Sequence, residues 1–137
     1  PHEFVRSCCR AGAQNALFVR DSKQAWYLLG IEGAEGKGFD AVVDAVSKEI
    51  ASVGPKRVVT VGASMGGYAA IRAGIALNAQ VAVAFSPQVL IDPNERSSRE
   101  LPSMPFDEAL RKLKLCTFVE GTPMLSLAAA VSQSPHS

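Results

Sequence analysis

The sequence predicts an α/β protein of three layers, α/β/α, around a mostly parallel sheet. Short apolar runs rich in β-branched residues alternate with helical patterns, which is the order that βαβ units produce. The hydrophobic content of 47% and the charged content of 20% are typical of an ordinary globular protein. The length of 137 residues limits the chain to a single domain, whose core we expect over residues 16–120.

The first part of the chain predicts two buried strands and a helix. The strands are expected at Ala16–Val19 (ALFV) and Ala25–Leu29 (AWYLL), because both runs are apolar and end at polar or glycine residues. The glycine-rich residues 31–38 predict a loop. From Phe39 to Val53 the apolar residues recur on one helical face, which predicts an amphipathic helix.

The middle of the chain predicts a strand, a helix and another strand. Arg57–Val61 and Val81–Phe85 are largely apolar and continuous, as strands of a covered parallel sheet usually are. Met65–Leu77 between them predicts a helix, with Asn78 as its C-cap. This order indicates a right-handed βαβ unit.

The last part of the chain has weaker patterns. Asp92–Pro105 is rich in proline, serine and charge, and it predicts a loop. Residues 106–113 (FDEALRKL) predict a helix, and residues 115–119 (LCTFV) predict a strand. Residues 122–137 lack a periodic pattern, and we expect this tail to be poorly ordered.

The most informative motif is G-x-S-x-G, in the segment RVVTVGASMGGYAAIRAG. Ser64 follows a predicted strand and precedes a predicted helix, which is where a nucleophile sits in a sharp strand-to-helix turn. Gly62, Gly66 and Gly67 lack the Cβ atoms that would crowd such a turn. The first amides of a helix have no partner within it, so the Met65 N–H is expected to point toward an oxyanion formed when Ser64 attacks a carbonyl.

A glycine-rich turn before a helix also binds phosphate groups. A second interpretation is therefore an NAD(P)-binding fragment of the short-chain dehydrogenase type. Tyr68 stands where that fingerprint has its third glycine, and the turn follows a later strand rather than the first. The sequence after the turn has no Tyr-x-x-x-Lys pair. These details favour the nucleophile turn.

Ser-Met-Gly-Gly after a V-x-V-G strand resembles the α/β-hydrolase superfamily. The stretch from Ala16 to Asp92, with ALFVRD, AWYLLG, SMGGYAA and AFSPQ, is similar to a group of bacterial-type α/β-hydrolases. The resemblance implies a serine hydrolase or acyl-transfer domain that acts on a small ester, thioester or amide through an acyl-serine at Ser64, without a cofactor or metal. Such enzymes usually need a longer chain and this one begins at Pro1, so we expect a fragment or truncated member with a partial α/β-hydrolase fold.

The resemblance also implies that the catalytic residues follow the chain order serine, acid, histidine. Glu120, which follows the predicted strand at 115–119, and Asp92 are the candidate acids. The chain has two histidines, and His136 is the candidate base because it follows Ser64. Its position beside the end of the sequence leaves open an alternative: a catalytically inactive α/β-hydrolase-like domain that binds an acyl or carbohydrate ligand, or a protein.

Further residues are candidates for contacts with the substrate. Tyr68, one helical turn beyond the nucleophile, and Trp26 would line an acyl pocket or lie as ordinary aromatic residues in the core. Gln88 lies in the loop after the predicted strand Val81–Phe85, and its side chain would reach the same pocket. The loop at Asp21 would supply the second oxyanion donor, although Asp21 also suits a plain turn.

Charge, hydropathy and cysteine content exclude other functions. A net charge of +1 without a basic stripe gives no electrostatic footprint for nucleic acid. No apolar run approaches the roughly 18 residues that a membrane span needs. Cys8 and Cys9 are adjacent, and the three cysteines match no zinc-ligand spacing, so we expect reduced thiols and a cytoplasmic location.

Overall fold

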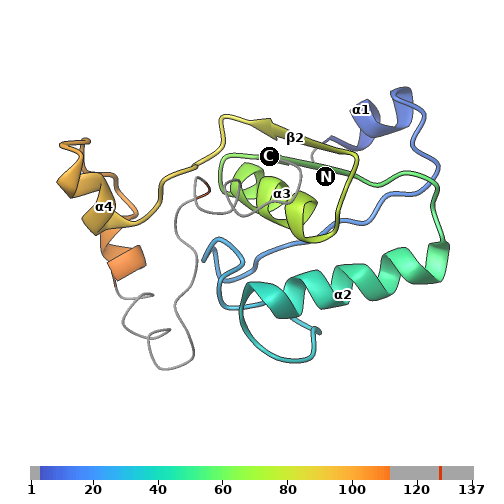
Figure 1. Cartoon of the computed structure of the whole chain (residues 1–137), viewed down its shortest axis with the longest axis horizontal. Helices are drawn as coiled ribbons and strands as arrows, with labels where there is room; N and C mark the ends of the chain where they lie inside the picture. The colour runs from blue at the N-terminus through green and yellow to red at the C-terminus, as the bar shows by residue number, and fades with distance from the viewer. Residues whose placement is uncertain (1–3, 112–126, 128–137) are drawn as a thin grey trace.

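Figure 1 shows the chain as a computed structural model, in which the structure describes residues 4–111 and 127. The described part is an α/β structure with a two-stranded parallel sheet. No helix within it is long and apolar enough to cross a membrane. The elements, in chain order, are α1 (Val5–Arg10), α2 (Gly38–Val53), β1 (Val59–Ala63), α3 (Met65–Ala76), β2 (Val81–Phe85) and α4 (Pro93–Ser98).

The sheet and α3 form the predicted β-α-β unit. β1 and β2 pair in parallel along all five residues of each strand, with Ala63 opposite Phe85. α3 packs against both strands. The helix comes closest at Gly74, where an added Cβ would lie 2.9 Å from Thr60 Oγ1 and 3.1 Å from the Cβ of Ala82. The predicted order of strand, helix and strand is confirmed, with bounds within two residues of those expected.

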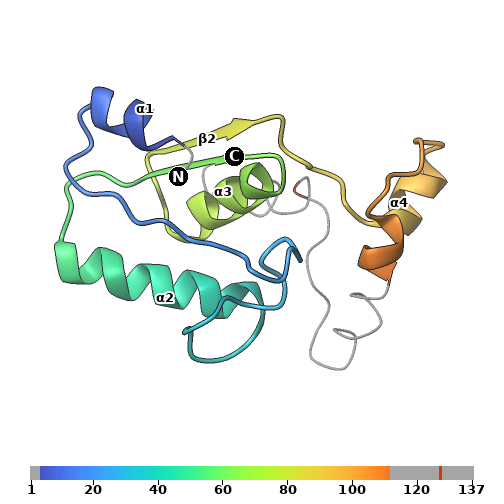
Figure 2. The same ribbon diagram turned by 180° about the vertical axis from the view of Figure 1, so that it is seen from behind.

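α2 follows the amphipathic pattern of its sequence. The helix buries Phe39, Ala41 and Val42, and it ends at Gly54, whose φ of +60° is a left-handed conformation that glycine adopts without steric cost. The guanidinium of Arg72 in α3 lies 4.1 Å from the centroid of the Phe39 ring, a cation–π contact between the two helices. Figures 1 and 2 both show α3 between the strands and α2.

The strands predicted at Ala16–Val19 and Ala25–Leu29 are wrong. Residues 15–20 have no regular structure, and residues 25–29 form a bend and turns. In the second run the carboxylate of Asp21 accepts hydrogen bonds from backbone N–H groups, and two residues have positive φ. Neither feature is compatible with the ladder of a sheet, so the apolar residues of this run reach the core from a turn instead.

The loop predicted at Asp92–Pro105 contains α4. Asp92 Oδ1 accepts hydrogen bonds from the N–H groups of Asn94 and Glu95, at 2.8 and 3.3 Å. Pro93 fills the first helical position, where its missing N–H costs nothing. An aspartate N-cap followed by proline is a local helix-start signal that the proline-rich composition obscured.

The structure beyond α4 agrees in part with the sequence. Residues 107–111 are helical, inside the helix predicted at 106–113. The strand predicted at 115–119 lies outside the described residues, as does the tail predicted at 122–137 apart from Leu127. Leu127 is buried, and its N–H donates to the carbonyl of Val89 at 2.9 Å.

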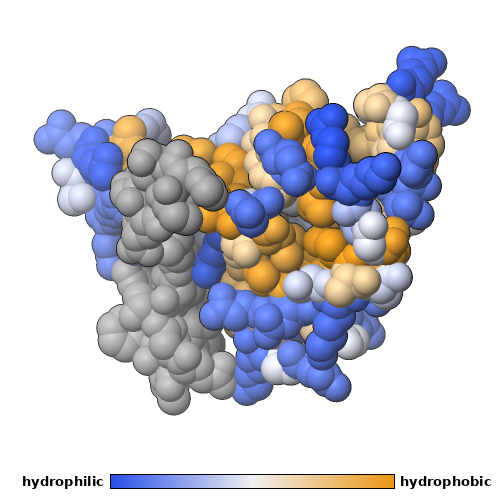
Figure 3. Space-filling model, turned by 45° about the vertical axis from the view of Figure 1, so that its right-hand side comes forward, coloured by the Kyte–Doolittle hydropathy of each residue, from blue (hydrophilic) through white to orange (hydrophobic). Residues whose placement is uncertain are grey.

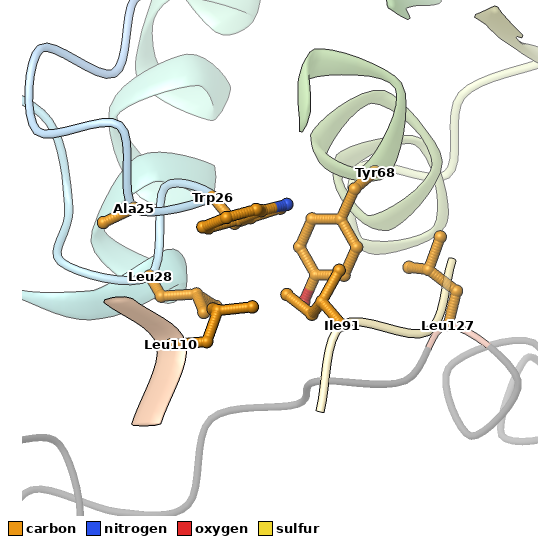
Figure 4. Close-up of a cluster of buried hydrophobic side chains, with 7 residues drawn as sticks. All are labelled: Ala25, Trp26, Leu28, Tyr68, Ile91, Leu110 and Leu127. Atoms are coloured by element: carbon orange, nitrogen blue, oxygen red, sulfur yellow. The ribbon is translucent and has the colours of Figure 1, made fainter. Parts of the chain in front are cut away.

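A buried apolar cluster connects α3 with the segments on either side of the β-α-β unit. Figure 4 shows that Trp26 and Tyr68 lie next to each other in this cluster, with Ile91 and Leu110 below them. Because its members lie up to about a hundred residues apart in sequence, only the folded chain can assemble it. The cluster consists of Ala25, Trp26, Leu28, Tyr68, Ile91, Leu110 and Leu127.

One side of the sheet has little cover in the described part of the chain. The exposed fractions of Val59, Val81 and Phe85 are 45%, 42% and 50%. The ring of Phe4 stacks on Phe85 with 5.1 Å between centroids. Figure 3 shows apolar surface on one face of the molecule. Strands of parallel sheets are usually buried on both faces, so this open face is unusual for the architecture.

Candidate active site

Ser64 occupies the sharp turn between β1 and α3. Its backbone has φ +51° and ψ −117°, a combination outside the regions that residues with a Cβ normally occupy. The residue is exposed. Backbone strain of this kind persists only where the surrounding structure holds it, and it is concentrated at functional sites. The geometry is that of the strand-to-helix turn that the motif predicts.

The glycines of the turn are not equivalent. A Cβ on Gly62 would lie 2.0 Å from the carbonyl oxygen of Gly66, so this position requires glycine. A Cβ on Gly67 would lie 3.1 Å from the Cα of Pro87. The absence of this Cβ lets the turn after β2 approach α3. A Cβ on Gly66 would meet nothing within 4 Å. The prediction that Gly66 is crowded is therefore wrong. The crowded position in the first turn of α3 is Gly67.

Backbone hydrogen bonds tie the Ser64 turn to the end of β2. The Ser64 N–H donates to the carbonyl of Phe85 at 2.9 Å. The Ser64 carbonyl accepts from the Tyr68 N–H at 3.2 Å, within the first turn of α3, and from the Gln88 N–H at 3.4 Å. These bonds fix the backbone of Ser64 on both sides of its strained torsion angles.

The Met65 amide begins α3, and its role as an oxyanion donor stays a prediction. Met65 is the first residue of α3, so its N–H has no acceptor within the helix. The helix dipole adds partial positive charge at this end. The Met65 side chain packs against the buried cluster, which fixes the first turn of the helix.

Asp21 organises the loop that was expected to supply a second donor. Its buried carboxylate accepts three backbone N–H groups, from Lys23 at 3.0 Å, Ala25 at 2.6 Å and Tyr27 at 2.9 Å. Burial raises the pKa of the Tyr27 phenol, and the negative charge of Asp21 raises it further. Asp21 therefore shapes the turn, as its second interpretation expected, while a direct contact with substrate stays a prediction.

The side chains of Gln88 and Trp26 bond directly to each other. The indole Nε1–H of Trp26 donates to Gln88 Oε1 at 2.7 Å, across 62 residues of sequence. The Trp26 ring also meets Phe106 edge to face, with 5.0 Å between centroids. The sequence indicated Gln88 and Trp26 separately, but no local pattern relates them.

Tyr68 lies in the core, as the second interpretation of this residue expected. It is fully buried in the cluster of Figure 4, and Nη1 of Arg72 donates to its phenol oxygen at 3.2 Å. Burial raises the pKa of the Tyr68 phenol, and the positive charge of Arg72 partly opposes this shift. The phenol is therefore neutral at physiological pH. Its role in an acyl pocket stays a prediction.

Of the remaining candidates, only Asp92 lies within the described residues. Asp92 caps α4 through its carboxylate, and its role as the catalytic acid stays a prediction. Glu120 and His136 lie outside the described residues. A second serine, Ser86, has a similar setting that the sequence did not single out: it is exposed, has φ +44° and directly follows Phe85 at the end of β2. The strand register shows the similarity, because Ala63 and Phe85 are paired and each is followed directly by one of the two serines.

Among residues 4–111 and 127, no group of three His, Cys, Asp or Glu side chains is arranged to hold a metal ion.

In comparison with known proteins, no family model matches the chain, and neither a curated protein nor a solved structure matches it. The resemblance to the α/β-hydrolase superfamily therefore rests on the residues of the motif, and it stays a prediction.

Proposed function

We propose that this chain carries the nucleophile and an oxyanion donor of an α/β-hydrolase-type serine hydrolase or acyl-transfer site. The position of Ser64 carries the proposal, because an exposed serine with φ +51° and ψ −117° stands between the end of β1 and the free N–H groups at the start of α3. The requirement for glycine at Gly62 supports it. The substrate class is a small ester, thioester or amide.

In the proposed reaction, Ser64 Oγ attacks the carbonyl carbon of the substrate while its proton passes to a general base, for which His136 is the candidate. The carbonyl π electrons move onto oxygen, and the Met65 N–H donates to that oxyanion. Collapse of the tetrahedral intermediate expels the alcohol, thiol or amine with a proton and leaves an acyl-serine. Water or another acceptor then takes the acyl group and frees Ser64.

The open sheet agrees with a partial fold. Val59, Val81 and Phe85 are exposed on strands that a complete three-layer α/β/α sheet would cover. We propose that β1, α3 and β2 are the central part of such a partial α/β-hydrolase fold.

A fluorophosphonate probe tests this function directly. Attack by Ser64 would form a phosphorus–oxygen bond and release fluoride, leaving a label on Ser64. Ser86→Ala is the matched control, since Ser86 is also exposed, also has positive φ and also follows a strand of the sheet. We expect labelling of the unmodified chain and of Ser86→Ala, and none of Ser64→Ala.

Two results would contradict the proposal. Labelling that survives in Ser64→Ala would place the nucleophile elsewhere. Absence of labelling in the unmodified chain at neutral pH would favour the inactive binding domain.

A further inference from the structure

The Ser64 turn and the loop at residues 21–27 are connected through one residue. Gln88 contacts both, because its backbone N–H donates to the Ser64 carbonyl at 3.4 Å and its side-chain Oε1 accepts from Trp26 Nε1–H at 2.7 Å. Pro87, directly before it, lies against Gly67 in the first turn of α3. The position of Gln88 relative to the nucleophile turn is therefore fixed by its backbone, and its side chain is available to hold something else.

What the side chain holds is a strained loop. Gln24, Trp26 and Tyr27 have φ values of +51°, +53° and +61°, which residues with bulky side chains rarely adopt. Such conformations persist only where tertiary contacts over-determine them. The carboxylate of Asp21 supplies the contacts inside the loop, through three backbone N–H groups.

Trp26 makes the contacts that connect the loop to the Ser64 side of the fold, while Tyr27 OH donates to the carbonyl of Val19 and Lys23 Nζ donates to that of Leu29. The Trp26 side chain is buried, packs in the cluster with Tyr68, and meets Phe106 edge to face. Apolar packing restrains the ring, and the hydrogen bond adds a polar contact at its Nε1 edge. The hydrogen bond to Gln88 is directional, and it joins the ring to the residue whose backbone N–H donates to the Ser64 carbonyl.

From this geometry we infer that Gln88 is a positioning residue, which holds the loop of residues 21–27 against the Ser64 turn by accepting the hydrogen bond of Trp26. The inference rests on the proposed function. Its chemical consequence is that the distance between the loop and Ser64 is set by Gln88 Oε1, and that the reactivity of Ser64 depends on this acceptor. A misplacement of about 1 Å at a reacting centre is enough to lower a rate by orders of magnitude.

Two substitutions of Gln88 separate an acceptor from a side chain that only fills space. Gln88→Met keeps the length of the side chain and removes the acceptor oxygen. Gln88→Glu keeps an acceptor oxygen for the indole N–H and removes the amide donors. Trp26 is the single tryptophan of the chain, so the proton resonance of its indole N–H reports the bond directly.

We expect the indole N–H resonance of Gln88→Met to move upfield and its exchange with solvent to accelerate, while the protein still unfolds cooperatively. The rate at which a fluorophosphonate labels Ser64 should fall about tenfold or more. Gln88→Glu should retain both the resonance and most of the labelling rate. Trp26→Phe should label as slowly as Gln88→Met, and the double variant no more slowly than either, because both remove one interaction.

The outcomes distinguish this inference from the proposed function. If the unmodified chain labels and Gln88→Met labels equally fast, the positioning role is wrong and the proposed function stands. If Gln88→Glu is as slow as Gln88→Met, the acceptor oxygen is not what matters, and the inference is overturned. If the unmodified chain does not label at all, the proposed function fails and the positioning role fails with it.

Discussion

Two serines stand at equivalent points of the sheet. Ala63 at the end of β1 is paired with Phe85 at the end of β2. Ser64 directly follows Ala63, and Ser86 directly follows Phe85. Both are exposed, and both have positive φ, +51° and +44°. The hydroxyl, its exposure and the left-handed backbone are therefore common to the two turns.

The residues that follow make the two turns chemically different. After Ser64 comes Met65, whose N–H begins α3 and has no acceptor within the helix. After Ser86 comes Pro87, which has no N–H at all. An oxyanion formed at Ser64 would meet a donor that the corresponding position after Ser86 cannot supply. The comparison teaches that a strained, exposed serine is insufficient, and that the start of a helix behind it supplies the electrostatic part of the site.

The largest effect is expected from closing the Ser64 turn sterically. In Gly62→Ala the new Cβ would lie 2.0 Å from the carbonyl oxygen of Gly66, so the strand end and the helix start must separate. We expect a loss of about 3 kcal/mol in the free energy of unfolding, measured by urea denaturation. Gly66→Ala is the control, since its Cβ would meet nothing within 4 Å, and we expect it to be neutral or stabilising. Equal destabilisation by both substitutions would contradict the close approach at Gly62.

A smaller effect should report the strain at Ser64 itself. Ser64→Gly relieves the positive φ, whereas Ser64→Ala retains a Cβ and therefore the strain. Both substitutions remove the hydroxyl, so the difference between their free energies of unfolding reports the effect of the backbone conformation. We expect the glycine variant to be about 1 kcal/mol more stable than the alanine variant in chemical denaturation. An alanine variant as stable as the glycine variant would show that the turn is relaxed.

The smallest effect is a loss of stability at alkaline pH. It comes from Tyr68 in α3, the helix that follows Ser64 and has no counterpart directly after Ser86. Because burial raises the pKa of Tyr68 in the folded chain, the folded state keeps this proton to higher pH than the unfolded state does. The stabilisation is complete below about pH 10, the ordinary value for tyrosine, and is lost as pH rises through the raised pKa.

Thermal unfolding between pH 8 and pH 11 measures this loss. Tyr68→Phe should show a shallower fall of the melting temperature than the unmodified chain. Tyr27→Phe is the comparison variant, because the pKa of Tyr27 is also raised. A Tyr68→Phe profile that follows the unmodified chain throughout would remove Tyr68 as a source of the pH dependence.

The elements that the sequence predicted well are those whose determinants are local. The run before Gly62, the helical pattern after Ser64 and the stripe from Phe39 to Val53 each combine a periodicity with a start or stop signal. The α4 helix also has such a signal, the Asp92 cap with Pro93, but the surrounding prolines and charges outweighed it. The predicted strand at Ala25–Leu29 failed for the opposite reason, because a carboxylate four to six residues away binds the amides that a strand would use.

The sequence by itself determined that Ser64 sits in a strand-to-helix turn, because the apolar strand, the glycines and the helix are all written within eighteen residues. Only the tertiary structure decided that Gly67, rather than Gly66, is the crowded position, since the crowding atom belongs to Pro87 in the turn after β2. The same holds for Gln88 and Trp26, which meet across 62 residues. Local patterns record backbone preferences, whereas these contacts depend on how separate segments pack, and no short stretch of sequence carries that information.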